Sequence, residues 1–224
     1  MTGKVVVVTG AGQGQGAAEA RLLAAEGATV IGCDLKPEPA EEFPGVEYRQ
    51  LDVTDAAGWA ALAAELDRVD LARVSEVNVT GTLLGIQALT PLMTDGGKRT
   101  LLPPAARKLA PGPCRRAAPS KWALRGLAKA ACLELGPRGI RVNTVHPGYI
   151  ETPVTASAAP AFRDANVAET PLGRTGTVDE VTPLVLFLVS DESSFITGAE
   201  IPVDGGLTAH GGVKSISDAV RQTL

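Results

Sequence analysis

A glycine-rich turn between a buried strand and a helix opens this chain and constrains its fold more than any other feature. Residues 5–8 are four valines, the pattern of a parallel strand with both faces buried. Gly10 permits a tight turn, Gly14 lets main-chain N–H groups approach a ligand, and Gly16 allows the next helix to pack closely on the strand. Residues 15–26 carry alanine and leucine at helical spacing. The N-terminus of such a helix is a phosphate site, because its N–H donors are unpaired and its dipole is positive there.

An acidic residue follows the second predicted strand, residues 29–33, where dinucleotide-binding units carry their ribose-binding carboxylate. The Asp34 carboxylate can accept hydrogen bonds from both ribose hydroxyls of an adenosine and would repel a 2′-phosphate. Leu35 supplies no cation, although Lys36 could help to bind a phosphate. We therefore predict NAD as the cofactor. The residues expected to hold its adenosine and pyrophosphate are Gly10, Gln13, Gly14, Gln15, Gly16 and Asp34.

Strand and helix patterns alternate along the rest of the chain, which predicts a parallel sheet covered on both faces. We expect residues 1–224 to form one α/β domain with a doubly wound parallel sheet of the Rossmann type. Further strands are expected at residues 47–51, 140–145 and 199–203, and further helices at residues 56–66, 73–93, 120–135 and 178–190.

Composition excludes several classes of function. A net charge of −4 argues against nucleic acid or an anionic membrane surface as the main partner. The longest apolar run, residues 181–189, is far shorter than the roughly 20 residues of a membrane span. Three cysteines without a CxxC pair favour a reducing cytoplasmic location. With cysteines so scattered, His146 and His210 predict no metal site, and His146 is expected to pack at a strand end.

The spacing of Thr9, Gly10, Gly14 and Gly16 resembles the short-chain dehydrogenase/reductase family. The run from residue 120 to 152 most resembles the hydroxysteroid-dehydrogenase-like branch. This resemblance implies an NAD-dependent oxidoreductase that interconverts a secondary alcohol and a ketone, with a steroid-like substrate, a substrate lid at residues 151–170 and a homo-oligomer, dimer or tetramer. Further segments similar to the family, in family order, are residues 51–53, 77–81, 120–123, 139–143, 146–148 and 203–206.

The resemblance also implies roles for individual residues. Asp52 would bind the adenine amino group, with Val53 beside the ring. Asn78 would hold a proton-relay water, and Lys121 would bind the nicotinamide ribose and lower the pKa of a catalytic tyrosine. Each has an alternative: Asp52 could cap the following helix, Asn78 could lie on the surface, and Lys121 could be solvated. The segment that would cradle the nicotinamide contributes Pro147, Gly148, Ile150 and Thr152.

Two catalytic groups of the family are missing from the sequence. Ala117 stands four residues before Lys121, where the family has its tyrosine, and neither Tyr48 nor Tyr149 has that spacing. No serine occurs between Ser75 and Ser120, although the family uses one to polarise the carbonyl. Because each positioned acid–base group contributes roughly 10²–10⁴ in rate, we expect a poor enzyme.

Two stretches also depart from the family pattern. The Asn-Asn-Ala-Gly turn after the fourth strand is missing near residue 70, and residues 95–119 are rich in proline and basic side chains, which predicts an irregular loop. We therefore expect one or two central strands to be absent. The chain is either a catalytically silent, dinucleotide-binding relative or the product of an internal deletion and a shifted reading frame. The abrupt return to the family pattern at Ser120 favours the second explanation.

Overall fold

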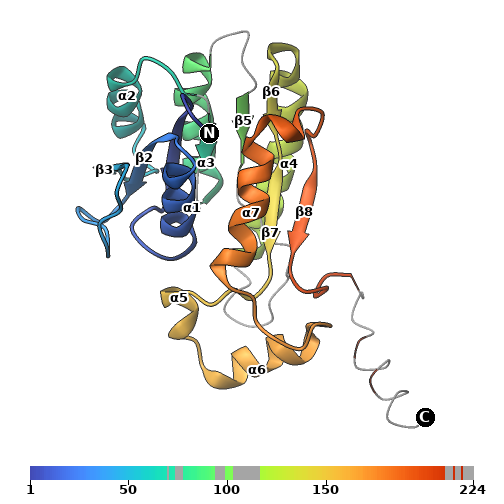
Figure 1. Cartoon of the computed structure of the whole chain (residues 1–224). Helices are drawn as coiled ribbons and strands as arrows, with labels where there is room; N and C mark the ends of the chain where they lie inside the picture. Colours follow the sequence, from blue (N-terminus) through green and yellow to red (C-terminus); the bar gives the residue numbers. More distant parts are fainter. Residues whose placement is uncertain are drawn as a thin grey trace.

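In the computed structural model, parallel strands form a sheet with helices on both faces (Figure 1). The structure describes residues 1–69, 71–73, 78–93, 99–102, 117–209, 214 and 218, without the side chains of 71–73, 78, 99 and 117–121. The main sheet has six strands in the order β3-β2-β1-β4-β5-β6, and a second sheet pairs β7 with β8. The strands are β1 (Val5–Thr9), β2 (Thr29–Asp34), β3 (Val46–Gln50), β4 (Leu71–Arg73), β5 (Arg99–Leu101), β6 (Ile140–Val142), β7 (Thr144–Pro147) and β8 (Glu200–Val203).

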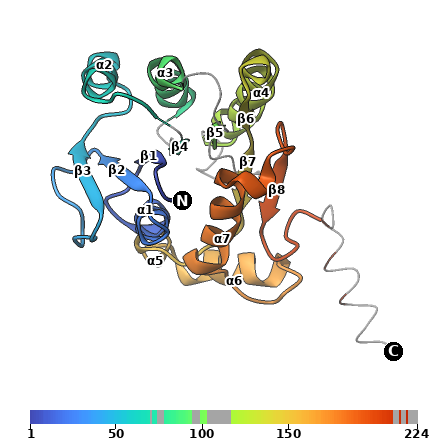
Figure 2. The same cartoon turned by 45° about the horizontal axis from the view of Figure 1, so that its top comes forward.

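The helices form two layers, which confirms the doubly wound α/β fold (Figure 2). One face of the sheet is covered by α2 (Ala56–Glu65), α3 (Asn78–Leu89) and α4 (Ala117–Leu135), and the other by α1 (Gly14–Ala25) and α7 (Val178–Val189). The shorter helices are α5 (Pro153–Ala156) and α6 (Pro160–Glu169), with 3-10 turns η1 (Thr90–Leu92), η3 (Gly136–Arg138) and η4 (Asp191–Ser193). Among the described residues, none of these helices has the length and apolar character needed to cross a bilayer.

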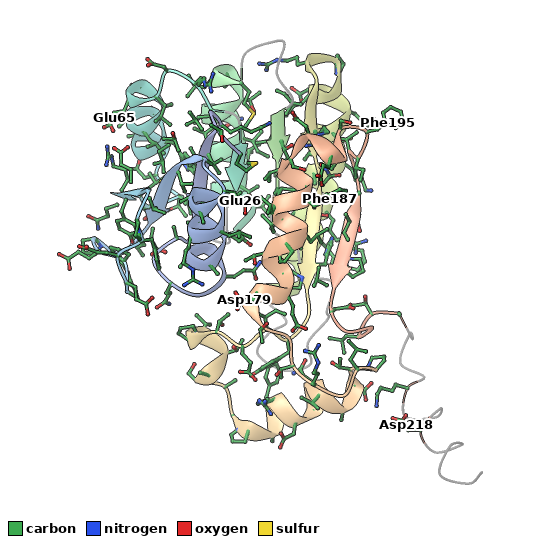
Figure 3. All side chains as sticks on the ribbon, viewed as in Figure 1. Glu26, Glu65, Asp179, Phe187, Phe195 and Asp218 are labelled. Atoms are coloured by element: carbon green, nitrogen blue, oxygen red, sulfur yellow. The ribbon has the colours of Figure 1, made fainter. Side chains whose placement is uncertain are left out.

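Two hydrophobic cores flank the sheet because side chains alternate along β1. Val7 packs in the core beneath α2 and α3, which also contains Trp59 and Leu89. Val6 and Val8 pack in the opposite core, beneath α1 and α7. Side chains fill the space on both sides of the sheet (Figure 3). This double burial explains the run of four valines that opens the first strand.

The expectation that one or two central strands are absent is wrong. Both positions in the sheet are filled by three-residue strands: β4 pairs with β1 and β5, and β5 pairs with β6. Three residues are too few to show the alternation of apolar and polar side chains that marks a strand in a sequence. These two strands are therefore recognised only by their pairing with neighbouring strands. Residues 99–101 of the expected loop therefore form a strand, and residues 117–119 open α4, where proline is tolerated in the first turn. Residues 103–116 lie outside the described part of the chain.

Two expected elements also have different boundaries. The helix expected at residues 73–93 begins at Asn78, because Arg73 pairs with Val8 in the sheet. The strand expected at residues 140–145 is divided at Asn143, which is buried. The Asn143 N–H donates to Leu101 of β5, whereas its side-chain oxygen accepts from Ala199 N–H next to β8. The chain therefore changes partners at this residue and passes from the first sheet into the second.

Candidate functional site

The glycine-rich turn has the geometry that its sequence predicts. Gly10 and Gly14 have positive φ angles of 70° and 62°, a conformation that other residues rarely adopt. A Cβ added at Gly16 would lie 2.3 Å from the carbonyl oxygen of Gly10. The start of α1 therefore packs against the turn more closely than any side chain would allow. The turn and the helix N-terminus together form a cradle of main-chain atoms at the carboxyl end of β1.

The N-terminus of α1 leaves its N–H donors available for an anionic ligand. Gln13 is the N-cap, and among the described residues no side chain caps this helix. The Gln13 side-chain oxygen instead accepts a 3.0 Å hydrogen bond from Lys36 Nζ. Gln15 donates its amide to Glu19 within the helix at 2.8 Å. The cradle therefore fits a phosphate group, which would receive hydrogen bonds from the main chain.

The Asp34 carboxylate lies directly against the glycine-rich turn. Its Oδ2 accepts a hydrogen bond from Gly12 N–H at 3.0 Å, and its Oδ1 accepts one from Lys36 N–H at 3.2 Å. A Cβ at Gly12 would lie only 2.9 Å from the carboxyl carbon. The fold thus brings the predicted ribose-binding residue to the predicted phosphate cradle, although they are about twenty residues apart in the sequence.

The predicted nicotinamide segment reaches the same place from the other half of the chain. It leaves β7 at Pro147, and its Gly148 N–H donates to Val203 of β8 at 2.9 Å. Thr152 then caps α5 through a reciprocal pair of hydrogen bonds with Thr155. A Cβ at Gly14 would lie 3.6 Å from the Cβ of Thr152, so the two segments are in contact distance. The end of this segment, at Thr152, therefore lies beside the N-terminal end of α1.

Asp52 and Val53 follow β3, with Val53 buried against α3. A Cβ at Gly81, in the first turn of α3, would lie 3.0 Å from a Val53 methyl group. Asp52 accepts hydrogen bonds from the Thr54 N–H at 2.8 Å and from the Thr54 hydroxyl at 2.7 Å, and these bonds lower the pKa of its carboxyl group. The residue that caps α2 is Asp55, whose side chain accepts from Ala57 N–H. The alternative role of Asp52 as the helix cap is therefore wrong.

The two predicted catalytic residues occupy known backbone positions. Asn78 is the first residue of α3, and Lys121 is the fifth residue of α4. Their side chains lie outside the described part of the structure, so their roles stay predictions. His146, in contrast, is placed as expected: it is buried in β7 and its Nε2 lies 2.9 Å from the Thr144 hydroxyl.

A cavity of about 240 Å³ is lined in part by the predicted nicotinamide segment. Its lining includes Tyr149, Ile150, Leu172 and Asp204. Tyr149 also holds the predicted lid, because its hydroxyl donates to the Thr155 carbonyl of α5 at 3.0 Å. The Tyr149 ring packs on Phe162 of α6, with 6.1 Å between the ring centroids. The sequence did not predict this anchoring role.

Comparison with known proteins identifies the family. A family model described as enoyl-(acyl carrier protein) reductase matches residues 47–208, and one described as short chain dehydrogenase matches residues 4–67. The chain is 35% identical to a 3-alpha-(or 20-beta)-hydroxysteroid dehydrogenase of Mycobacterium tuberculosis, over 93% of this chain and 91% of that protein. The chain belongs to the short-chain dehydrogenase/reductase family. It is therefore related to oxidoreductases along most of its length.

Other short-chain dehydrogenase/reductase members are similarly related. The chain is 35% identical to a trans-4-hydroxycyclohexanecarboxylate dehydrogenase of Sinomonas cyclohexanicum, over 92% of this chain and 93% of that protein. It is 37% identical to a cyclopentanol dehydrogenase of Comamonas testosteroni, over 92% and 98% of the two chains. The alignment with the hydroxycyclohexanecarboxylate dehydrogenase runs over 246 positions, which exceeds the 224 residues of this chain. The relatives therefore carry residues that this member of the family lacks.

Solved structures agree on the fold. A protein described as ribose-5-phosphate isomerase from Brucella melitensis 16M superposes with a TM-score of 0.84 at 29% identity, covering 97% of this chain and 96% of that one. A short-chain dehydrogenase/reductase mutant from Serratia marcescens gives a TM-score of 0.81 at 26% identity, covering 92% and 98%. These two neighbours do not share one described activity, so the assignment to the oxidoreductases rests on the sequence relatives.

Proposed function

We propose that this chain binds NAD(H) and belongs to the members of its family that interconvert a secondary alcohol and a ketone. The observation that carries the proposal is the placement of Asp34. Its carboxylate, held by the Gly12 and Lys36 N–H groups, lies at the edge of the phosphate cradle, where the adenosine ribose of a dinucleotide would follow its pyrophosphate. Negative charge at that position disfavours the 2′-phosphate of NADP.

Each end of the cofactor would have its own set of contacts. The main chain of the glycine-rich turn and the first turn of α1 would bind the pyrophosphate. Asp52 and Val53 would contact the adenine, and Pro147, Gly148, Ile150 and Thr152 the nicotinamide. The bound nicotinamide supplies hydride transfer to or from the carbon of the alcohol or ketone. The protein would then have to orient the substrate, exclude water and move the hydroxyl proton.

We propose a cyclic secondary alcohol as the substrate class. The three relatives named above are described as dehydrogenases of a hydroxysteroid, a hydroxycyclohexanecarboxylate and cyclopentanol, each of which contains a ring. In this chain the cavity beside the nicotinamide segment has apolar walls at Ile150 and Leu172, which suits a ring. The helices α5 and α6, anchored by Tyr149, would close over it as the lid. A homo-oligomeric state is a further prediction from the family, and a cytoplasmic location is a prediction from the scattered cysteines.

Asp34→Ala should weaken NADH binding about tenfold or more, because one or two charge-assisted hydrogen bonds to ribose hydroxyls are lost, each contributing roughly 1.5–3 kcal/mol. The preference for NADH over NADPH should narrow at the same time. Fluorescence titration with both dinucleotides measures the two dissociation constants. Glu38→Ala is the matched control, since it removes an exposed carboxylate from the same loop. A wild-type chain that binds NADPH at least as tightly as NADH would contradict the assignment.

Lys121→Ala should weaken NADH binding detectably. In the family this lysine binds the nicotinamide ribose, and with no tyrosine four residues before it this contact is its remaining task. The measurement is the same NADH titration, with Lys129→Ala as a control two turns further along α4. An unchanged dissociation constant would support a solvated lysine at position 121 and would remove it from the proposed site.

A second candidate function is dinucleotide binding without chemistry. It is favoured by Ala117 at the position of the family's tyrosine and by the lack of any serine between Ser75 and Ser120. The cofactor site and the strands that carry it are the same under both proposals. NADH binding without turnover would support a catalytically silent, dinucleotide-binding protein. A chain that neither binds NADH nor turns over substrate would indicate a defective product of the gene.

A further inference from the structure

The strand β3 lies at the edge of the main sheet, next to β2 and therefore next to the ribose-binding Asp34 (Figure 1). Side chains two residues apart on a strand point to the same face. Tyr48 is paired with Gly32 and Gln50 with Asp34 in the register between the two strands. The side chains of Tyr48 and Gln50 are therefore directed along one face toward the segment that follows Asp34.

These two side chains bind successive carbonyl groups of that segment. The Tyr48 hydroxyl donates to the Lys36 carbonyl at 3.0 Å, and Gln50 Nε2 donates to the Leu35 carbonyl at 3.0 Å. The same turn is closed from within, because the Lys36 N–H donates to Asp34 Oδ1. Both carbonyls of the turn and the carboxylate at its start are thus held in one orientation.

The Tyr48 side chain lies beside Gly32, and the lack of a side chain at Gly12 makes room for its hydroxyl group. A Cβ at Gly32 would lie 3.8 Å from a ring carbon of Tyr48, an ordinary contact distance, so the ring lies next to Gly32 of β2. A Cβ at Gly12 would lie 3.1 Å from the Tyr48 hydroxyl oxygen and 2.9 Å from Asp34 Oδ2. The hydroxyl group, the carboxylate and the glycine-rich turn therefore meet at one point. Burial, together with the charge of Asp34, raises the pKa of Tyr48 to about 12, which keeps the phenol protonated as a donor.

The same turn also fixes Lys36, a cation that could assist a 2′-phosphate. Lys36 follows Asp34 by two residues, and its Nζ is bound to the side-chain oxygen of Gln13 at the start of α1. The hydrogen bond from Tyr48 to the Lys36 carbonyl also limits the positions that the Lys36 side chain can reach. The charge of Lys36 is thereby directed to the glycine-rich turn, and the carboxylate of Asp34 stays exposed to the ribose position.

We propose that Tyr48 is a positioning residue that sets the choice between NAD and NADP. It acts by holding the turn of residues 34–36, so that Asp34 is presented to the ribose hydroxyls and Lys36 stays on Gln13. Release of the turn would let the carboxylate swing away and let Lys36 approach a 2′-phosphate. The inference rests on the proposed NAD(H) function and adds a residue that has no contact with the cofactor's reacting atoms.

The test is Tyr48→Phe, which keeps the ring and removes only the hydroxyl. NADH binding should weaken about two- to tenfold, the effect of one neutral hydrogen bond, while NADPH binding should stay the same or improve. Gln50→Leu releases the Leu35 carbonyl of the same turn and should shift the ratio of the two dissociation constants in the same direction, by less, because Gln50 is exposed. Fluorescence titrations with NADH and NADPH give both ratios.

Tyr149→Phe is the matched control, because it removes the same kind of bond from tyrosine to a main-chain carbonyl, but at the lid. It should leave the ratio between NADH and NADPH unchanged. If Tyr48→Phe leaves the ratio of the NADH and NADPH dissociation constants unchanged, which includes equal weakening of both, the inference is overturned. NADH binding by the wild type would still support the proposed function in that case. Failure of the wild type to bind either dinucleotide would overturn both.

Discussion

The purified chain should oxidise cyclopentanol, or any other secondary alcohol, with NAD far more slowly than the roughly 10 s⁻¹ of a typical enzyme. Ala117 offers no ionisable group where the family has its tyrosine, and the family's serine is also missing. Each lost group lowers the rate by roughly 10²–10⁴. Tyr149 is not available to replace the tyrosine, because its hydroxyl is bound to the Thr155 carbonyl and its ring to Phe162. The measurement is NADH formation by absorbance at saturating substrate.

Variants separate the causes of low turnover. Ala117→Tyr alone should not restore activity, since the preceding residues contain no serine and depart from the family pattern. Replacing residues 95–119 and the segment after Asp70 with the corresponding segments of an active relative should restore it, because Asp34 and Thr152 already lie against the glycine-rich turn. Turnover near roughly 10 s⁻¹ by the unmodified chain would mean that another residue moves the proton. Sequencing the gene across codons 70 to 120 distinguishes divergence from a shifted reading frame.

Gly16→Ala should destabilise the protein by about 3 kcal/mol and abolish NADH binding. The new Cβ would lie 2.3 Å from the Gly10 carbonyl oxygen and 2.7 Å from its carbon, which are main-chain atoms that cannot rotate away. The turn itself would have to move, and it is the turn that presents the phosphate cradle. The midpoint of thermal unfolding should fall by roughly 6–12 °C for a domain of this size.

Gly126→Ala provides the matched control. Gly126 is also inside a helix, α4, but a Cβ there meets no atom within 4 Å among the described residues. Alanine is favoured over glycine in an exposed helix by about 0.5–1 kcal/mol, so this variant should be slightly more stable and bind NADH normally. Equal thermal midpoints for the two variants would show that the turn tolerates a side chain and would contradict the geometry of the cradle.

The sequence by itself determined the parts of this protein whose conformation depends on local sterics. Gly10, Gly14 and Gly16 specify the turn because other residues cannot adopt its φ angles or its close approach. The valine run of β1 specifies a strand buried on both faces, at Val6, Val7 and Val8. Asp34 stands at the end of the next strand. Its position beside the turn follows from the parallel topology, because the carboxyl ends of neighbouring parallel strands meet at one edge of the sheet.

Only the tertiary structure decided the rest. The strands β4 and β5 have three residues each and exist as strands because of their neighbours, so no pattern in the chain could predict them. One strand ends before Asn143 and the next begins at Thr144, because the main-chain partners of these two residues, Leu101 and Ala199, come from different parts of the chain. Tyr48 lies beside Asp34 for the same reason: the register between β2 and β3, which is set by packing across the whole sheet, determines which side chain faces the Asp34 carboxylate.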